Sequence, residues 1–114
     1  MALYYDLPVY RDTYKLILKI FECTRDFSKE YKYSLGQDMK RDALQLVRSI
    51  YRANKSAQKA AHLEKFMDDF ELLKLEIRLS VDMKVIPVKK QAELSLLMDS
   101  IGKQITGWRN ASVE

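Results

Sequence analysis

Residues 94–108, which read LSLLMDSIGKQITGW, decide the fold. Large apolar residues follow one another there at intervals of 3, 1, 3, 4 and 3 positions: Leu94, Leu97, Met98, Ile101, Ile105 and Trp108. This spacing places all six side chains on one side of an α-helix. A helix with one apolar side needs other helices or a sheet to cover it. The stretch therefore predicts a long helix that packs into a core.

The rest of the chain repeats this helical pattern. Among 114 residues only 3 are glycine and 2 are proline, too few for the many turns of a β-sandwich or barrel. Pro8 and Pro87 stand where a helix is expected to begin, and Ser34 with Gln37 has the spacing of a capping box. We expect an all-α protein with helices over residues 8–30, 35–54, 57–84 and 87–108.

The connections between these helices are short. Short connections make consecutive helices antiparallel neighbours, so the sequence predicts an up-down-up-down four-helix bundle that forms a single domain over residues 1–114. No apolar run reaches the 18 or so residues that a membrane-spanning helix needs, and the first residues lack the pattern of a signal peptide. With only one cysteine, Cys23, the chain has no disulfide framework. We expect a soluble, cytoplasmic protein.

Apolar residues are more numerous than one bundle core requires. A second apolar stripe accompanies the first helix, and further apolar side chains lie beside the core positions of the second and third. Large exposed apolar patches usually mark interfaces, which predicts a homo-oligomer. The alternative is that the third helix is simply central and well buried. The residues expected at the oligomer interface are Leu16, Ile20, Phe27, Leu44, Tyr51, Leu72, Leu75 and Leu79.

The net charge of +4 is concentrated in one segment. Residues 35–59 hold six basic and two acidic residues, whereas the rest of the chain has 14 of each. Five of the six cations share one helical face, opposite the apolar one: Arg41, Arg48, Arg52, Lys55 and Lys59. A face of one charge sign is typical of contacts with a phosphate backbone, although any amphipathic helix also has a solvated face. We expect this face to bind RNA or DNA without reading its sequence.

Catalytic and metal-binding patterns are missing from the sequence. His62 is the only histidine, no phosphate-binding glycine loop occurs, and the carboxylates near Glu76 lack the Glu-x-x-His motif of di-iron bundles. Cys23 falls on an apolar stripe, which favours packing over nucleophilic attack. We expect no catalytic residues, no metal, no cofactor and no enzymatic activity.

Four segments resemble one known family. The first segment is Leu35-Gly36 followed by Arg41 and Ala43. The others are residues 50–55, residues 72–79 with 82–84, and residues 101–108, of which the last is the most specific to the family. The chain is similar to the four-helix-bundle proteins of 23S rRNA intervening sequences, and most similar to the accessory variability determinants of diversity-generating retroelements. Ala53-Asn54-Lys55-Ser56 stands where the intervening-sequence branch carries an Asn-Ile-Ala-Glu-Gly-like segment. This departure favours the retroelement branch.

The resemblance implies a ring-shaped homopentamer with a basic surface. It also implies a non-catalytic protein that binds nucleic acid and a reverse transcriptase, and that assists the copying of a template RNA. By matching position, the basic contacts carried over are Arg41, Arg52, Lys55 and Arg78, to which spacing alone adds Arg48 and Lys59. The alternative is an oligomeric scaffold protein of the intervening-sequence family whose basic face docks an acidic protein partner. Neither function involves a membrane.

Overall fold

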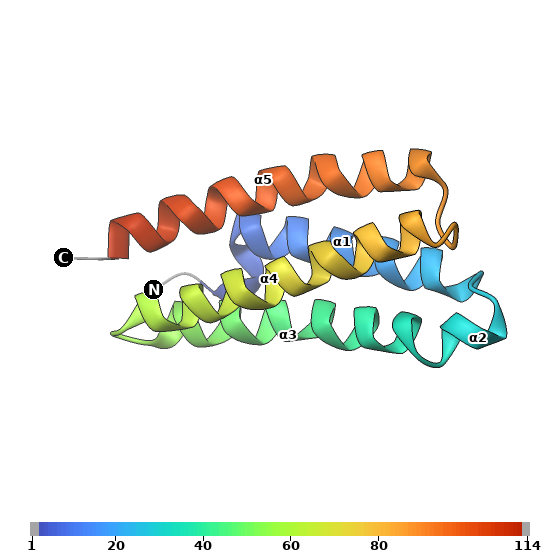
Figure 1. Ribbon diagram of the computed structural model, residues 1–114. Helices are drawn as coiled ribbons and strands as arrows, with labels where there is room; N and C mark the ends of the chain where they lie inside the picture. Colours follow the sequence, from blue (N-terminus) through green and yellow to red (C-terminus); the bar gives the residue numbers. More distant parts are fainter. Residues whose placement is uncertain (1–2, 113–114) are drawn as a thin grey trace.

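Four long helices make up most of the molecule (Figure 1). The computed structural model describes residues 3–112, and within that range it contains helices and no strand. The elements are the 3₁₀ turn η1 (Tyr4–Asp6), α1 (Pro8–Arg25), the short α2 (Lys29–Lys32), α3 (Leu35–Lys55), α4 (Lys59–Asp82) and α5 (Val88–Ser112). The all-α class and the four long helices are therefore confirmed.

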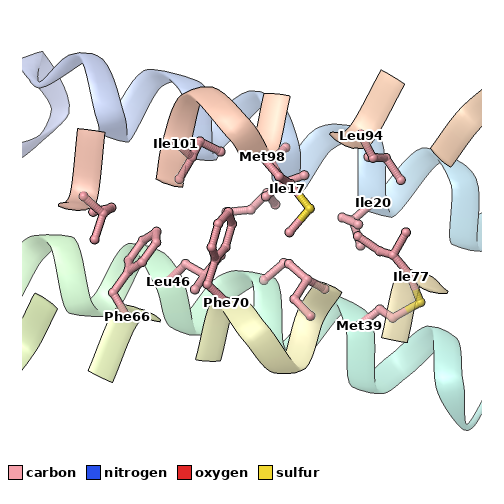
Figure 2. Packing of buried hydrophobic residues seen from close by; sticks show 14 of the residues in the cluster. Ile17, Ile20, Met39, Leu46, Phe66, Phe70, Ile77, Leu94, Met98 and Ile101 are labelled. Atoms are coloured by element: carbon pink, nitrogen blue, oxygen red, sulfur yellow. The ribbon is translucent and has the colours of Figure 1, made fainter. Parts of the chain in front are cut away.

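Each long helix packs against two others, so that they surround a single core. α3 contacts α1 and α4, and α5 contacts α4 and α1. In Figure 1 the chain runs along the bundle, whose extents are 45 × 22 × 21 Å, and turns back at each connection between long helices. Figure 2 shows the inner side chains that meet between the helices, with Phe66 and Phe70 of α4 near the centre. Phe66, Leu46 and Ile101 are completely buried, as their helical spacing predicts.

The first helix ends at Arg25, before the expected end at Glu30. Beyond it the chain turns, and Phe27 is buried close to the beginning of α3. A Cβ on Gly36 would lie 3.3 Å from Phe27 Cδ2 and 3.3 Å from the Tyr31 carbonyl oxygen, so the absent side chain permits this close approach. The prediction of a capping box at Ser34 is wrong. The Ser34 hydroxyl donates to the Glu30 carbonyl oxygen at 3.0 Å and makes no capping hydrogen bond to α3.

The end of α4 has the geometry of a Schellman motif. Lys84 has a φ of 62°, in the left-handed region. The amide of Val85 donates to the Ser80 carbonyl at 2.7 Å, and the amide of Lys84 donates to the Val81 carbonyl at 2.9 Å. This pair of bonds satisfies carbonyl groups that the last turn of a helix leaves without partners. The turn ends α4 before α5 begins.

Three residues expected at an oligomer interface belong instead to the core. Leu16 and Ile20 are fully buried and Phe27 is 5% exposed within the single chain. α1 packs on both α3 and α5. This places the side of α1 with Leu16 and Ile20 inside, while Leu18 and Phe21 on another side of the helix are exposed. The apolar arc of α1 covers too much of its circumference for spacing to identify the inner side. The prediction for Leu16, Ile20 and Phe27 is wrong for this reason.

The other five expected interface residues are exposed. Leu44 and Tyr51 lie on α3, and Leu72, Leu75 and Leu79 lie on α4. Their side chains are between 41% and 53% exposed, so the third helix is not fully buried. We name Leu72, Leu75, Leu79 and the exposed Met83 the α4 apolar row. Among residues 3–112 no helix is long and apolar enough to cross a bilayer.

Candidate nucleic-acid interface on α3

The outer face of α3 carries a row of cations because its inner face is fixed by packing. Met39, Leu46 and Ile50 have no exposed surface, and this holds the opposite side of the helix toward solvent. Four exposed cations lie there: Arg41, Arg48, Arg52 and Lys55. We name these four residues the basic stripe. The structure thus brings together four of the six residues that the sequence singled out.

Arg48 and Arg52 are the two least engaged members of the basic stripe. Both are exposed, and neither forms an ion pair within residues 3–112. Arg41 lies 3.2 Å from Asp38 Oδ1 and 3.6 Å from Asp42 Oδ1. Exposed ion pairs of this kind are worth about 0–1 kcal/mol, so a phosphate can compete for Arg41. The two unpaired guanidinium groups are nevertheless the most available donors.

Lys55 combines charge with an aromatic ring. Its Nζ lies 4.4 Å from the ring centroid of Tyr51 and donates to the Tyr51 hydroxyl at 3.4 Å. Cation–π contacts at exposed sites contribute about 0.5–1 kcal/mol, which positions the ammonium group without neutralising it. Lys55 therefore still presents a full positive charge at the end of the basic stripe.

Lys59 has a structural role that excludes it from the basic stripe. Its Nζ donates to three carbonyl oxygens at the end of α3: Ala53 at 2.9 Å, Asn54 at 3.1 Å and Ser56 at 2.9 Å. These bonds use all three protons of an ammonium group. They also satisfy terminal carbonyls where the helix dipole favours a cation. The expected phosphate contact by Lys59 is wrong because this side chain caps α3.

Arg78 is placed away from the other cations. It belongs to α4 and lies 3.5 Å from Asp82 Oδ2. With Gln91 and Ser95 it lines a shallow depression between α4 and α5, rather than the outer face of α3. A nucleic acid that follows the basic stripe would have to leave α3 to reach it. Arg78 therefore stands apart from the basic stripe, and its role as a basic contact stays a prediction.

Sequence reasoning missed Lys40 as a member of this surface. Lys40, Arg41 and Arg48 line one shallow depression of α3 together with the exposed Leu44. The Lys40 ammonium also lies 5.6 Å from the ring centroid of Phe21 on α1. Lys40 falls outside the helical arc of the basic stripe, so spacing alone excluded it. Its position next to Arg41 in the sequence was the available signal.

Behind the basic stripe, two carboxyl groups are buried between α3 and α4. Asp42 and Glu76 are each 7% exposed, and Asp42 Oδ2 and Glu76 Oε1 have no hydrogen-bond partner within the described residues. Burial has the largest effect on Glu76, followed by the neighbouring Asp42 carboxyl group and the charge of Asp38. Together they raise the pKa of Glu76 to about 8, against a smaller opposing effect of Arg41. Glu76 is therefore mostly protonated at neutral pH.

Cys23, the single cysteine of the chain, has a shielded thiol. Cys23 is buried and its Sγ lies 3.5 Å from the Ile20 carbonyl oxygen. Burial raises the pKa of this thiol to about 11, so it is protonated and a poor nucleophile at neutral pH. In the part of the chain that the structure describes, no three histidine, cysteine or acidic side chains gather where they could hold a metal ion.

Comparison with known proteins identifies one family. A family model described as bAvd-like matches residues 9–112, which include all four long helices except Pro8, the first residue of α1. The match extends over the basic stripe and the α4 apolar row. No curated protein matches the chain.

Proposed function

The chain belongs to the bAvd-like family of accessory variability determinants, and from this premise we propose that it binds nucleic acid while it docks a reverse transcriptase. Its task is to assist the copying of a template RNA in a diversity-generating retroelement. The family is one of accessory proteins rather than a class of enzymes. We propose accordingly that the chain is non-catalytic and works as a cytoplasmic binding protein.

The observation that carries the proposal is the pair of unpaired guanidinium groups, Arg48 and Arg52, on the exposed face of α3. Each can donate bidentate hydrogen bonds to a phosphate. Binding of phosphates by such cations releases condensed counterions, which gives an affinity that falls steeply with salt. Contacts of this kind position a strand but read no bases, so sequence choice is left to the reverse transcriptase.

Assembly multiplies this electrostatic effect. We propose a ring-shaped homo-oligomer, with five copies as the family resemblance implies. Five copies would carry about +20, five times the +4 of one chain. Several basic stripes around one ring act together on a long strand, because the second contact becomes intramolecular once the first has formed.

Two exposed apolar surfaces suit contacts between copies. One is the α4 apolar row, and the other is formed by Leu18 and Phe21 of α1 with Leu44 of α3. A ring requires a heterologous contact, in which two different surfaces of the same chain meet. α4 holds four basic and six acidic residues, a formal charge of −2, whereas α1 holds four basic and two acidic residues, a formal charge of +2. The helices that carry the two surfaces therefore have formal charges of opposite sign.

The test is a salt titration of nucleic-acid binding by charge-reversal variants. We expect Arg48→Glu/Arg52→Glu to weaken binding of a single-stranded RNA by at least tenfold and to lower the slope of log K against log[salt] by about 1.4, or 0.7 for each lost phosphate contact. The matched control is Lys89→Glu/Lys103→Glu on α5, which changes the net charge equally at exposed sites. Equal effects of both variants would mean that net charge, and not the basic stripe, drives binding.

The same experiment separates the alternative function. A scaffold protein that docks an acidic protein partner through the basic stripe would bind RNA no more tightly than it binds other polyanions. Unchanged RNA affinity in Arg48→Glu/Arg52→Glu would overturn the proposed function and favour that scaffold. Circular dichroism of each variant checks that the bundle is intact.

A further inference from the structure

Five of the seven tyrosines gather at one end of the bundle. They come from three elements: Tyr4 and Tyr5 from η1, Tyr10 and Tyr14 from α1, and Tyr51 from α3. We name these five residues the tyrosine cluster. The other two, Tyr31 and Tyr33, lie in or next to α2, which is at the opposite end of the molecule in Figure 1.

Tyr4 holds the tyrosine cluster together. Its ring lies edge to face with three others, at centroid distances of 5.3 Å to Tyr5, 5.4 Å to Tyr10 and 5.2 Å to Tyr51. Tyr14 joins through Tyr10 at 6.2 Å. Edge-to-face pairs at these distances are favourable and orient each ring relative to the next. The cluster is therefore an ordered group of rings rather than a set of separate surface residues.

The outer rings of the tyrosine cluster are accessible. Tyr5 is 49% exposed, Tyr14 is 50% exposed and Tyr51 is 43% exposed. This is a large aromatic surface that the folded chain leaves uncovered.

Cations border the tyrosine cluster on two sides. On α3, Lys55 contacts Tyr51 and continues the basic stripe. On α1, Arg11 and Lys15 line one shallow depression together with Tyr10 and Tyr14, and neither forms an ion pair within residues 3–112. Asp6 of η1 is the acidic residue adjacent in sequence to Tyr5. Exposed rings with cations on either side are what a strand of unpaired bases requires, since bases stack on the rings and phosphates meet the charges.

We propose that the tyrosine cluster is a stacking platform for the unpaired bases of a single-stranded nucleic acid whose phosphates follow the basic stripe. The proposal rests on the proposed function and deepens it, because it assigns a preference for single strands over duplexes. Duplex bases are already stacked on one another and cannot reach the rings, whereas duplex phosphates still reach the cations. An aliphatic protein partner suits the α4 apolar row better than a surface of phenol rings between cations.

The experiment compares three labelled probes by fluorescence polarisation at fixed salt: a single-stranded DNA, the same DNA as a duplex, and the same strand built with abasic spacers. We expect the wild-type protein to bind the strand with bases at least about 5-fold more tightly than the abasic strand, as stacking of one base implies. Tyr5→Leu/Tyr14→Leu should lose this preference and leave duplex binding unchanged. This variant keeps Tyr4, Tyr10 and Tyr51, and Tyr33→Leu near α2 is its matched control.

The outcomes distinguish failure of this inference from failure of the proposed function. Equal binding of the strands with and without bases, or an unchanged preference in Tyr5→Leu/Tyr14→Leu, overturns the platform while the basic stripe stands. An unchanged affinity of Arg48→Glu/Arg52→Glu for the nucleic acid overturns the proposed role of the basic stripe. The preference for the strand with bases over the abasic strand still tests the stacking platform in that case. An altered oligomeric state of Tyr5→Leu/Tyr14→Leu with unchanged base preference would make the cluster a contact between copies and overturn the inference.

Discussion

Replacing Glu76 by glutamine should stabilise the protein, and the gain should grow with pH. The pKa of Glu76 is raised from 4.5 to about 8, so between these values the folded chain binds a proton that the unfolded chain has lost. The stability that this proton provides is complete below pH 4.5 and is lost as the pH rises toward 8. At about 1.4 kcal/mol per pH unit, the wild-type chain has lost about 3 kcal/mol by pH 7 and about 4 kcal/mol by pH 8.

The Glu76→Gln variant would avoid this loss because a glutamine amide is neutral at every pH and can still donate to Asp42. We expect Glu76→Gln and the wild-type chain to have similar melting temperatures at pH 4.5, and the variant to melt about 10 °C higher at pH 7. Thermal unfolding followed by circular dichroism from pH 4.5 to pH 8 measures the difference. The matched control is Glu71→Gln on the same helix, where the carboxylate is 73% exposed and pairs with Lys74.

A difference between Glu76→Gln and wild type that stays constant from pH 4.5 to pH 8 would refute the reasoning. It would mean that Glu76 is ionised in the folded state and that the protein solvates the charge. A gain of equal size in Glu71→Gln would also refute it, since the effect would then come from net charge rather than burial.

The remaining predictions concern structural positions. Lys59→Met should lower the free energy of unfolding by about 1–3 kcal/mol by leaving carbonyls without donors, and should change RNA affinity less than twofold; urea denaturation and polarisation measure these. Gly36→Ala should cost about 1–3 kcal/mol in urea denaturation because its Cβ would crowd Phe27 and the Tyr31 carbonyl. Lys84→Gly should stabilise the protein by about 0.5–1 kcal/mol by removing left-handed strain, and a lower urea midpoint would contradict the motif. Leu75→Asp should reduce the particle mass in light scattering to that of one chain, whereas an unchanged mass would exclude the α4 apolar row from assembly.

Periodicity predicted the helices well because the helix period and the positions of breakers are local properties. Leu63, Phe66 and Leu73 follow the helical period on one side of α4, and all three are fully buried. The same reasoning failed for α1, because apolar residues there cover so much of the helix that its orientation depends on α3 and α5. Which side of such a helix faces inward is decided by its neighbours, and these are not encoded in its own spacing.

The candidate site was predicted in outline and misjudged in detail for a similar reason. Arg48, Arg52 and Lys55 are exposed on α3 as the helical arc requires. Lys59 lies on the same arc in the sequence, yet the chain reverses between α3 and α4, and this turns its ammonium group back onto the carbonyls of α3. The burial of Glu76 against Asp42 likewise depends on a contact between two helices. Local spacing reports which residues share a helical face, but not what lies opposite them.

The acidic residues of α3 make the net positive charge of the helix larger in its second half than in its first. Both acids of the helix, Asp38 and Asp42, lie in its first half, and both are within 3.6 Å of Arg41. In the first half these two acids balance the charges of Lys40 and Arg41, whereas no acid balances Arg48, Arg52 and Lys55 in the second half. This is the half that meets the tyrosine cluster through the contact between Lys55 and Tyr51. The strongest attraction for phosphates and the exposed aromatic rings therefore coincide at one end of the bundle, so a bound strand should contact this end in preference to the end that carries α2.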